Sequence, residues 1–202
     1  PGRPFPATYG GKSFPEGGKD PWDLSDQQIL LLERDRIRHI LAMKLQDAET
    51  AAKWSNQLQQ AAEELPWGIP VNISSDPRHG ASKAGAEYKS DGCDVSKWPE
   101  GLGIAATFSP QVCLELGNAI SIEYRAMGIT TALSPQVDLA TEPRWMRFED
   151  TFGTNPDQVT ELGKIYCDSL QTTQGSPDGW GQDSVCAMAK HWPGGGPCEG
   201  GR

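Results

Sequence analysis

Residues 185–196 read Val185-Cys186-Ala187-Met188-Ala189-Lys190-His191-Trp192-Pro193-Gly194-Gly195-Gly196. The first five are small or apolar, which is typical of a strand buried on both faces. A cation, an imidazole and an indole follow directly, and then a loop of proline and glycine. Parallel strands of α/β barrels end in this way, because such barrels carry their functional groups at the carboxyl ends of the strands.

Two earlier segments end in a similar set of polar and aromatic side chains. One is Asp76-Pro77-Arg78-His79, which follows a predicted strand at 69–74, and the other is Pro143-Arg144-Trp145-Met146-Arg147. Carboxyl ends of neighbouring parallel strands lie at the same edge of a sheet. We therefore expect the ends of these two segments and of the 185–196 stretch to meet in one pocket.

Helical periodicity separates the predicted strands. Apolar residues recur at helical spacing from about Ala48, after the helix start at Ser109-Pro110, and after Asn155-Pro156. Pro66 ends the first of these helices and Gly128 the second.

The sequence before Ala48 is less regular. Residues 1–24 are rich in proline and glycine and are expected to form an extended arm. Ser25 and Gln28 match a capping box and predict a helix start. Residues 36–45 fit either a continued helix or a strand.

Strands are predicted at 69–74, 104–108, 129–139 (interrupted by Pro135) and 185–189. Because strands alternate with helices, the expected fold class is α/β with a parallel sheet. A closed (β/α)8 TIM-like barrel needs roughly 250 residues, so 25–202 is interpreted as an incomplete barrel. We expect the remaining strands on polypeptide after Arg202, where the chain ends behind a glycine-rich run.

Amino-acid composition and net charge exclude some classes of binding partner. The 202 residues are 37% hydrophobic, enough for a substantial core, and the formal net charge is −9 with no basic run. This charge argues against nucleic acid and against an anionic membrane surface, and no apolar run reaches the length of a membrane span. The 7 tryptophans suit stacking on flat apolar faces such as those of sugar rings.

The 5 cysteines lack any C-x-x-C spacing, so a zinc site is disfavoured, and neither metal nor cofactor is expected. Cys113, Cys167 and Cys186 lie in apolar periodic segments and are predicted to be buried thiols. Cys93 and Cys198 lie in predicted loops and are either paired with each other or free.

Four motifs occur in a fixed order: Gly68-Ile69-Pro70-Val71 leading to Asp76-x-x-His79-Gly80; Trp98-Pro99-x-Gly101-Leu102-Gly103-x-Ala105-Ala106-Thr107; Ser134-Pro135-Gln136-Val137-Asp138-Leu139-Ala140-x-x-Pro143-Arg144-Trp145-x-Arg147-x-Glu149; and Ala189-Lys190-His191-Trp192-Pro193-Gly194. In this order they resemble the glycoside hydrolases of family 3, especially the β-glucosidase and exo-glucanase branch. The likeness covers roughly residues 48–196 and favours a strand near His39.

The resemblance implies a β/α barrel followed by an α/β sandwich domain, and a retaining mechanism through a covalent glycosyl-enzyme. In this family the nucleophilic aspartate lies on a later barrel strand and the acid/base usually lies beyond the barrel. Both would fall after Arg202, so no catalytic residue is expected in this chain. The chain would provide the sugar-binding half of the −1 subsite.

The resemblance assigns Asp76 to the hydroxyls at the non-reducing end of a terminal glucose, and Arg147 to a further sugar contact. Lys190 as a charged donor and His191 as a neutral donor would bind one edge of the ring, which requires a bend because neighbouring strand residues point to opposite faces. The alternatives are a turn aspartate at Asp76, and ion pairs that tie the basic residues to nearby carboxylates. Spacing alone would also allow Asp76 as a nucleophile, against the family pattern.

Further residues are candidates for support. Arg144 is expected to brace the loop, with Glu142, Glu149 or Asp150 as an ion-pair partner for it or for Arg147, and Glu149 is included as a supporting residue. His79 either supports its loop or contacts ligand. Trp98, Trp145 and Trp192 either stack on sugar or pack in the core.

The leading prediction is a retaining, exo-acting β-glucosidase that releases terminal β-D-glucosyl residues from β-glucosides or β-glucan oligosaccharides. Asp76 favours glucosides, because xyloside-cleaving branches tend to carry glutamate there, and Gly195 disfavours the β-N-acetylglucosaminidase branch. The alternatives are a β-xylosidase or other glycosidase of the family, a non-catalytic sugar-binding module, and a barrel lyase with a Schiff base on Lys190 and phosphate bound by Gly194–Gly196. A secreted or periplasmic location is favoured over a cytoplasmic one.

Overall fold

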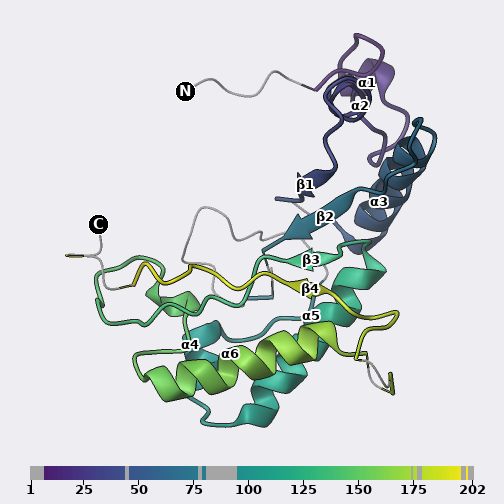
Figure 1. The fold of residues 1–202 in the computed structure, drawn as a ribbon. Helices are drawn as coiled ribbons and strands as arrows, with labels where there is room; N and C mark the ends of the chain where they lie inside the picture. Colours follow the sequence, from purple (N-terminus) through teal and green to yellow (C-terminus); the bar gives the residue numbers. More distant parts are fainter. Residues whose placement is uncertain are drawn as a thin grey trace.

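The computed structural model describes residues 7–43, 46–76, 79–80, 95–173, 175–176, 179–196 and 199. Within them the chain forms a parallel sheet of 4 strands in the order β1-β2-β3-β4. The strands are β1 (His39–Leu41), β2 (Asn72–Ser75), β3 (Thr131–Ala132) and β4 (Cys186–Ala187). Figure 1 shows them side by side in chain order.

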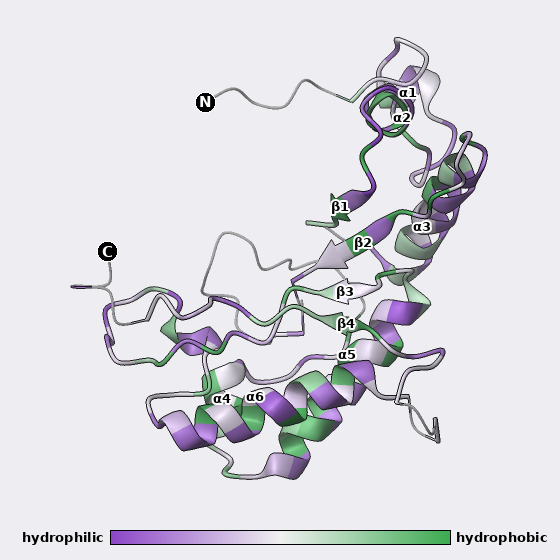
Figure 2. Cartoon of the chain, viewed as in Figure 1, coloured by the Kyte–Doolittle hydropathy of each residue, from purple (hydrophilic) through white to green (hydrophobic). Residues whose placement is uncertain are grey.

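Helices fill each crossover between neighbouring strands. Helix α3 (Ala48–Glu63) links β1 to β2, α4 (Gly101–Ala105) and α5 (Pro110–Ala126) lie between β2 and β3, and α6 (Pro156–Gln171) links β3 to β4. This is the β/α repeat of an α/β barrel, and it confirms the predicted fold class. Figure 2 shows apolar residues alternating with hydrophilic ones along α5 and α6, as amphipathic helices require.

Helices α5 and α6 pack closely against each other, and a glycine makes this approach possible. A Cβ added to Gly117 of α5 would lie 1.8 Å from Oγ of Ser169 on α6. The core between these helices and the sheet contains Ile73, Ala132 and Val185 from the strand regions. The two helices thus form one layer that packs on the sheet through these apolar residues.

The first part of the chain contains more local structure than an extended arm. A short helix α1 (Phe14–Gly17) precedes α2 (Asp26–Glu33). The predicted capping box is present, since the Ser25 side chain accepts from Gln28 N–H while the Gln28 side chain accepts from Ser25 N–H. The ambiguous segment 36–45 contains strand β1, as the resemblance favours.

The predicted strand at 104–108 is wrong, because these residues belong to α4 and the turn after it. A short run of four apolar residues and a threonine fits either structure, and its two alanines favour a helix. Ile104 and Ala105 are buried in the core, whereas Phe108 is 82% exposed with a φ of 50°. The segment 137–139 also forms no strand: Pro135 has no N–H for a ladder, and only an isolated bridge joins Gln136 to Lys190.

The predicted burial of β4 on both faces is wrong within the described residues. Val185 is buried, but Cys186 is exposed and Met188 is 46% exposed, because one face of the sheet is covered by helices and the other is open. The prediction of buried thiols holds for Cys113, while Cys167 is half-buried. Cys93 and Cys198, and most of the predicted loop at 80–101, lie outside the described residues.

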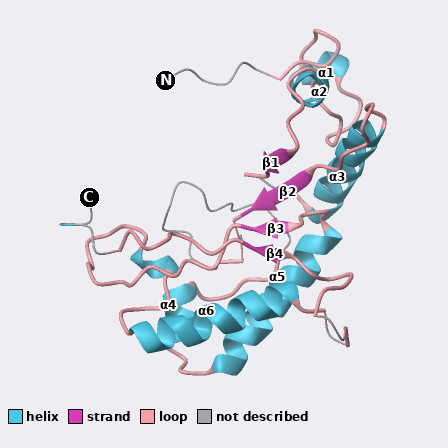
Figure 3. Cartoon of the chain, viewed as in Figure 1, coloured by secondary structure: helices cyan, strands magenta, loops and turns pink. Residues whose placement is uncertain are grey.

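The long loops after β3 and β4 gather at one edge of the sheet. Figure 3 shows both on the side to which the strand arrows point. This edge carries the carboxyl ends of the strands, where the sequence predicts a pocket. None of the described helices is long and apolar enough to cross a membrane.

Candidate active site

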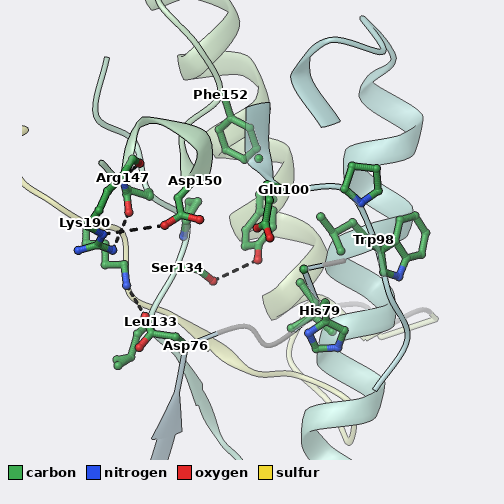
Figure 4. A pocket seen from close by; sticks show the side chains of 18 residues that line it. Asp76, His79, Trp98, Glu100, Leu133, Ser134, Arg147, Asp150, Phe152 and Lys190 are labelled. Carbon is green, nitrogen blue, oxygen red and sulfur yellow. Dashed lines mark hydrogen bonds and ion pairs between the residues drawn. The ribbon is translucent and has the colours of Figure 1, made fainter. Parts of the chain in front are cut away.

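A cavity of about 190 Å³ opens at this edge of the sheet. Figure 4 shows that Asp76 after β2, Arg147 after β3 and Lys190 after β4 all line it. The three strand ends named in the sequence analysis therefore meet in one cavity. Its remaining lining comes from the segment after β2, the loop before α4, helices α5 and α6, and the long segment after β3 that contains Gln136, Asp150 and Phe152.

Asp76 and Lys190 form an ion pair inside the cavity. The Lys190 ammonium donates a hydrogen bond to Oδ1 of Asp76. The Lys190 side chain is 18% exposed and the Asp76 side chain is 29% exposed. The backbone carbonyl of Asp76 accepts from the hydroxyl groups of Tyr124 and Ser75. Asp76 is thus fixed at its carboxylate and at its backbone, and its neighbours Pro77 and Arg78 lie outside the described residues.

Arg147 is held by three acceptors from different parts of the chain. Its Nη2 donates to Oε1 of Gln136 at 2.8 Å, its Nη1 lies 3.2 Å from Nε2 of His191, and its Nε lies 3.9 Å from Oδ2 of Asp150. Each terminal nitrogen carries two N–H groups and uses one of them in these contacts between described residues. The guanidinium therefore keeps donors for a ligand in the cavity.

His191 is tied to a buried carboxylate that the sequence analysis does not select. The Asp138 side chain is fully buried, and its Oδ2 lies 2.9 Å from Nδ1 of His191 and 3.3 Å from the His191 backbone nitrogen. Its other oxygen accepts from the N–H of Gly195. Burial alone would raise the pKa of Asp138, but these hydrogen bonds outweigh it and hold the pKa below its ordinary value.

The peptide bond between Lys190 and His191 is cis. Lys190 faces Asp76 and His191 faces Arg147, so adjacent residues reach two parts of one cluster. The predicted bend is present at this point of the chain.

His79 lies against the cavity wall and is 2% exposed. Its Nε2 lies 2.9 Å from Oε2 of Glu123 on α5, which also accepts from the Ser96 N–H at 3.0 Å. Burial lowers the pKa of His79, and the nearby Glu123 carboxylate opposes this only in part. These contacts match the interpretation of His79 as a residue that supports its loop.

Arg144 and Glu149 do not line the cavity. Arg144 pairs with Glu142 at 2.7 Å, its side chain is 71% exposed, and its hydrogen bonds lower the pKa of Glu142 to about 2. Glu149 is half-buried in the short 3-10 helix η1 (Phe148–Asp150), and its neighbour Asp150 lines the cavity instead. A supporting role for these two residues stays a prediction.

The three candidate tryptophans have different surroundings. Trp98 lines the cavity and packs against the core, Trp145 is half-buried beside Gly196, and Trp192 is 88% exposed. Stacking on a ligand is open to Trp192 because of this exposure.

Sequence reasoning does not select three polar residues of the site, Gln136, Asp138 and Glu100, whereas Asp150 lies near Arg147 as one of the ion-pair partners it offers. Asp138 has the clearest signal, since it stands between Val137 and Leu139 in an apolar segment, where a carboxylate is expected to be either partnered or functional. No group of three or more potential metal ligands occurs among the residues that the structure describes. The cavity combines three carboxylates (Asp76, Glu100 and Asp150) with an ammonium, a guanidinium and an amide, and this mix of acceptors and donors suits a polyhydroxylated, uncharged ligand.

Comparison with known proteins points to the same family as the four sequence motifs. The family model "Glycosyl hydrolase family 3 N terminal domain" matches residues 24–201. A periplasmic β-glucosidase/β-xylosidase of Dickeya chrysanthemi is 37% identical over 92% of this chain and 28% of its own length. Beta-glucosidase C of Emericella nidulans is 36% identical over 94% of this chain and 30% of its own length.

Among solved structures, a β-glucosidase from Erythrobacter marinus is similar with a TM-score of 0.68 and 28% identity, over 81% of this chain and 20% of that one. The chain spans less than a third of the length of each of these relatives. Both the extent of the family match and the identity to the relatives confirm the resemblance that the four motifs indicate. The chain belongs to glycosyl hydrolase family 3, and its residues 24–201 match the model of the family's amino-terminal domain.

Proposed function

We propose that this chain forms the sugar-binding half of the −1 subsite of a retaining, exo-acting β-glucosidase. The observation that carries the proposal is the meeting of Asp76, Arg147 and Lys190, from three strand ends, in one cavity of a family 3 chain. The nucleophile and the acid/base are expected on polypeptide outside these 202 residues.

In this proposal the ionised Asp76 accepts hydrogen bonds from two neighbouring hydroxyls of the terminal glucose. Lys190, already beside Asp76, donates to the same edge of the ring, and Arg147 donates through its remaining N–H groups. A hydrogen bond to a charged group contributes about 1.5–3 kcal/mol. Such bonds accelerate hydrolysis only where they strengthen as the ring flattens toward the oxocarbenium-like transition state.

His191 belongs to the same cluster, and its predicted contact with a ring hydroxyl remains a prediction. The lyase alternative has weaker support, because a Schiff-base amine must be unprotonated and Lys190 is placed as a cation against a carboxylate. Trapping with borohydride and a carbonyl substrate would leave Lys190 unmodified.

A β-xylosidase is the second candidate, because the Dickeya relative carries both names. The two substrates differ by a hydroxymethyl group, and such a difference in a fitted pocket changes kcat/KM by about 10-fold or more. We favour glucose because position 76 holds aspartate. The same relative supports a periplasmic or secreted location as part of the proposal.

The test is hydrolysis of p-nitrophenyl β-D-glucoside and β-D-xyloside by the full-length polypeptide that contains this chain. The expected result is a higher kcat/KM for the glucoside, with the β-anomer as the first product seen by proton NMR. Binding of glucose without turnover would instead indicate a non-catalytic module. Preference for the xyloside would transfer the proposal to the second candidate.

A further inference from the structure

The hydrogen-bonding roles of His191 follow from its two neighbours. A carboxylate only accepts, so the Nδ1 that lies 2.9 Å from Asp138 must carry a proton. A guanidinium only donates, so the Nε2 that lies 3.2 Å from Arg147 must offer a lone pair. Only the neutral tautomer with its proton on Nδ1 satisfies both contacts.

Asp138 is built to keep this arrangement. Its side chain is fully buried, and it receives the backbone N–H groups of His191 and Gly195 as well as the imidazole. A buried carboxylate with several donors is held in one orientation and stays ionised. The imidazole therefore has a fixed partner on the side away from Arg147.

Arg147 depends on this side of the cluster for its own position. Its guanidinium is fixed by Gln136 through Nη2 and by His191 through Nη1, while Asp150 lies farther away at 3.9 Å. The two closer contacts define the plane of the guanidinium, because each uses a different terminal nitrogen. Losing the acceptor at His191 would leave the plane free to turn.

We propose that Asp138 is a positioning residue of the sugar site: it fixes the tautomer of His191, whose Nε2 then orients the Arg147 guanidinium for the ligand. The inference rests on the proposed function of the cavity. His191 does not itself line the cavity, and its Nε2 serves as an acceptor from Arg147. Because its one N–H is used by Asp138, this role replaces the predicted donation from His191 to a ring hydroxyl.

Asp138→Asn tests the link. When its oxygen keeps the Gly195 N–H, the new amide nitrogen can donate to Nδ1 of His191, and only the 3.3 Å contact from the His191 backbone N–H loses its acceptor. The proton then moves to Nε2, and an N–H faces the Nη1 group of Arg147 where a lone pair stood before. A tautomer-setting aspartate in a serine protease gives the known example of such a change, with its geometry kept and its rate lost. We expect kcat/KM for p-nitrophenyl β-D-glucoside to fall by about 10- to 100-fold, as for one charge-assisted hydrogen bond.

A double-mutant cycle separates positioning from simple structural damage. In an Arg147→Lys background, which lacks the planar guanidinium, Asp138→Asn is expected to lower kcat/KM by less than about 3-fold. The reason is that the effects of substitutions at interacting residues are not additive. An equal cost in both backgrounds would overturn the inference. Asp35→Asn, in an exposed pair with Arg34, is the matched control and should leave kcat/KM unchanged.

Two further measurements keep the inference testable if Asp138→Asn does not fold. His191→Gln retains an acceptor for Arg147 and His191→Ala does not, so the first should be more active, and the difference should vanish in the Arg147→Lys background. Nitrogen NMR of the full-length protein with labelled histidine should show an unprotonated Nε2 at His191, and a protonated Nε2 would refute the proposal. A wild-type protein without β-glucosidase activity would refute the proposed function, while the NMR result would still decide the tautomer.

Discussion

At the scale of single residues, four charged groups of the cavity lie in two pairs of opposite charge before any ligand arrives. Lys190 pairs with Asp76, and Arg147 lies near Asp150 and Gln136. Removing one member of a half-buried pair leaves the other without its partner, which costs more than the pair contributes. The function of each residue is therefore tied to that of its partner.

Replacing Lys190 by methionine keeps most of the side-chain volume and removes the charge. We expect kcat/KM of the full-length protein for a β-glucoside to fall by about 10- to 150-fold, because a charged donor to the sugar is lost. Steady-state kinetics measure this, with Lys164→Met on the exposed face of α6 as the control. Unchanged kinetics for Lys190→Met would show that the pair only stabilises the fold.

His79 should make the stability of the protein depend on pH. Burial holds its pKa below the ordinary value of 6.5 in the folded state, so the unfolded chain takes up this proton first as the pH falls. The free energy of unfolding should therefore decrease as the pH falls below 6.5. Above pH 6.5 the stabilising contribution of neutral His79 should be fully present. Urea unfolding of wild type and His79→Gln between pH 8 and pH 5 measures the effect, and the variant should show the shallower dependence. The same slope in both proteins would exclude His79 as the source.

At the scale of secondary-structure elements, α5 connects the core to the site. Its buried face packs on α6, while its Glu123 and Tyr124 bind His79 and the Asp76 carbonyl. A displacement of α5 would therefore also move Asp76 and His79 at the carboxyl end of β2. The position of α5 depends on how closely it approaches α6.

Gly117→Ala should destabilise the protein although alanine is the better helix former. The intrinsic gain is about 1 kcal/mol, whereas overpacking typically costs about 1–3 kcal/mol, and the added Cβ would lie 2.8 Å from Cβ of Ser169. Thermal unfolding should show a lower Tm for Gly117→Ala. Adding Ser169→Gly makes room for the methyl group and should recover part of the loss. If the single variant has a raised Tm, the close approach of the helices is wrong.

At the scale of the whole molecule, the sheet has one face without a helix layer. Leu41 and Met188 are 45% and 46% exposed, and Cys186 is also exposed. The chain spans less than a third of the relatives it matches, and in a closed β/α barrel this face would turn toward the barrel interior. The open face is the surface on which the full-length protein is expected to differ from these 202 residues.

Cys186 provides a probe of this expectation. In the full-length protein its thiol should react with a maleimide at least 10-fold more slowly than in the urea-unfolded protein, because the barrel interior excludes the reagent (about 1 kcal/mol or more of protection). Mass spectrometry of the peptide that contains Cys186 gives the rate. Labelling at the unfolded rate would mean that the face stays open.

Local patterns in the sequence predict most elements correctly. Ser25 and Gln28 predict the capping box, the apolar periodicity predicts α3, α5 and α6, and the alternation of strands with helices predicts the parallel sheet. The prediction fails at 104–108, where four apolar residues and a threonine have no period that separates strand from helix. It also fails for Cys186, because exposure depends on which neighbours cover the sheet.

The sequence by itself determined the class of fold, the family, and the kinds of side chain that stand at the ends of three strands. These properties depend on residues close together in the chain, and on the order of motifs along it. Only the tertiary structure decided which side chains pair: Lys190 and Asp76 are 114 positions apart, and His191 and Asp138 are 53 apart. The tautomer of His191 and the orientation of Arg147 depend on distances between such remote residues, and folding sets these distances by packing α5 and α6 against the sheet.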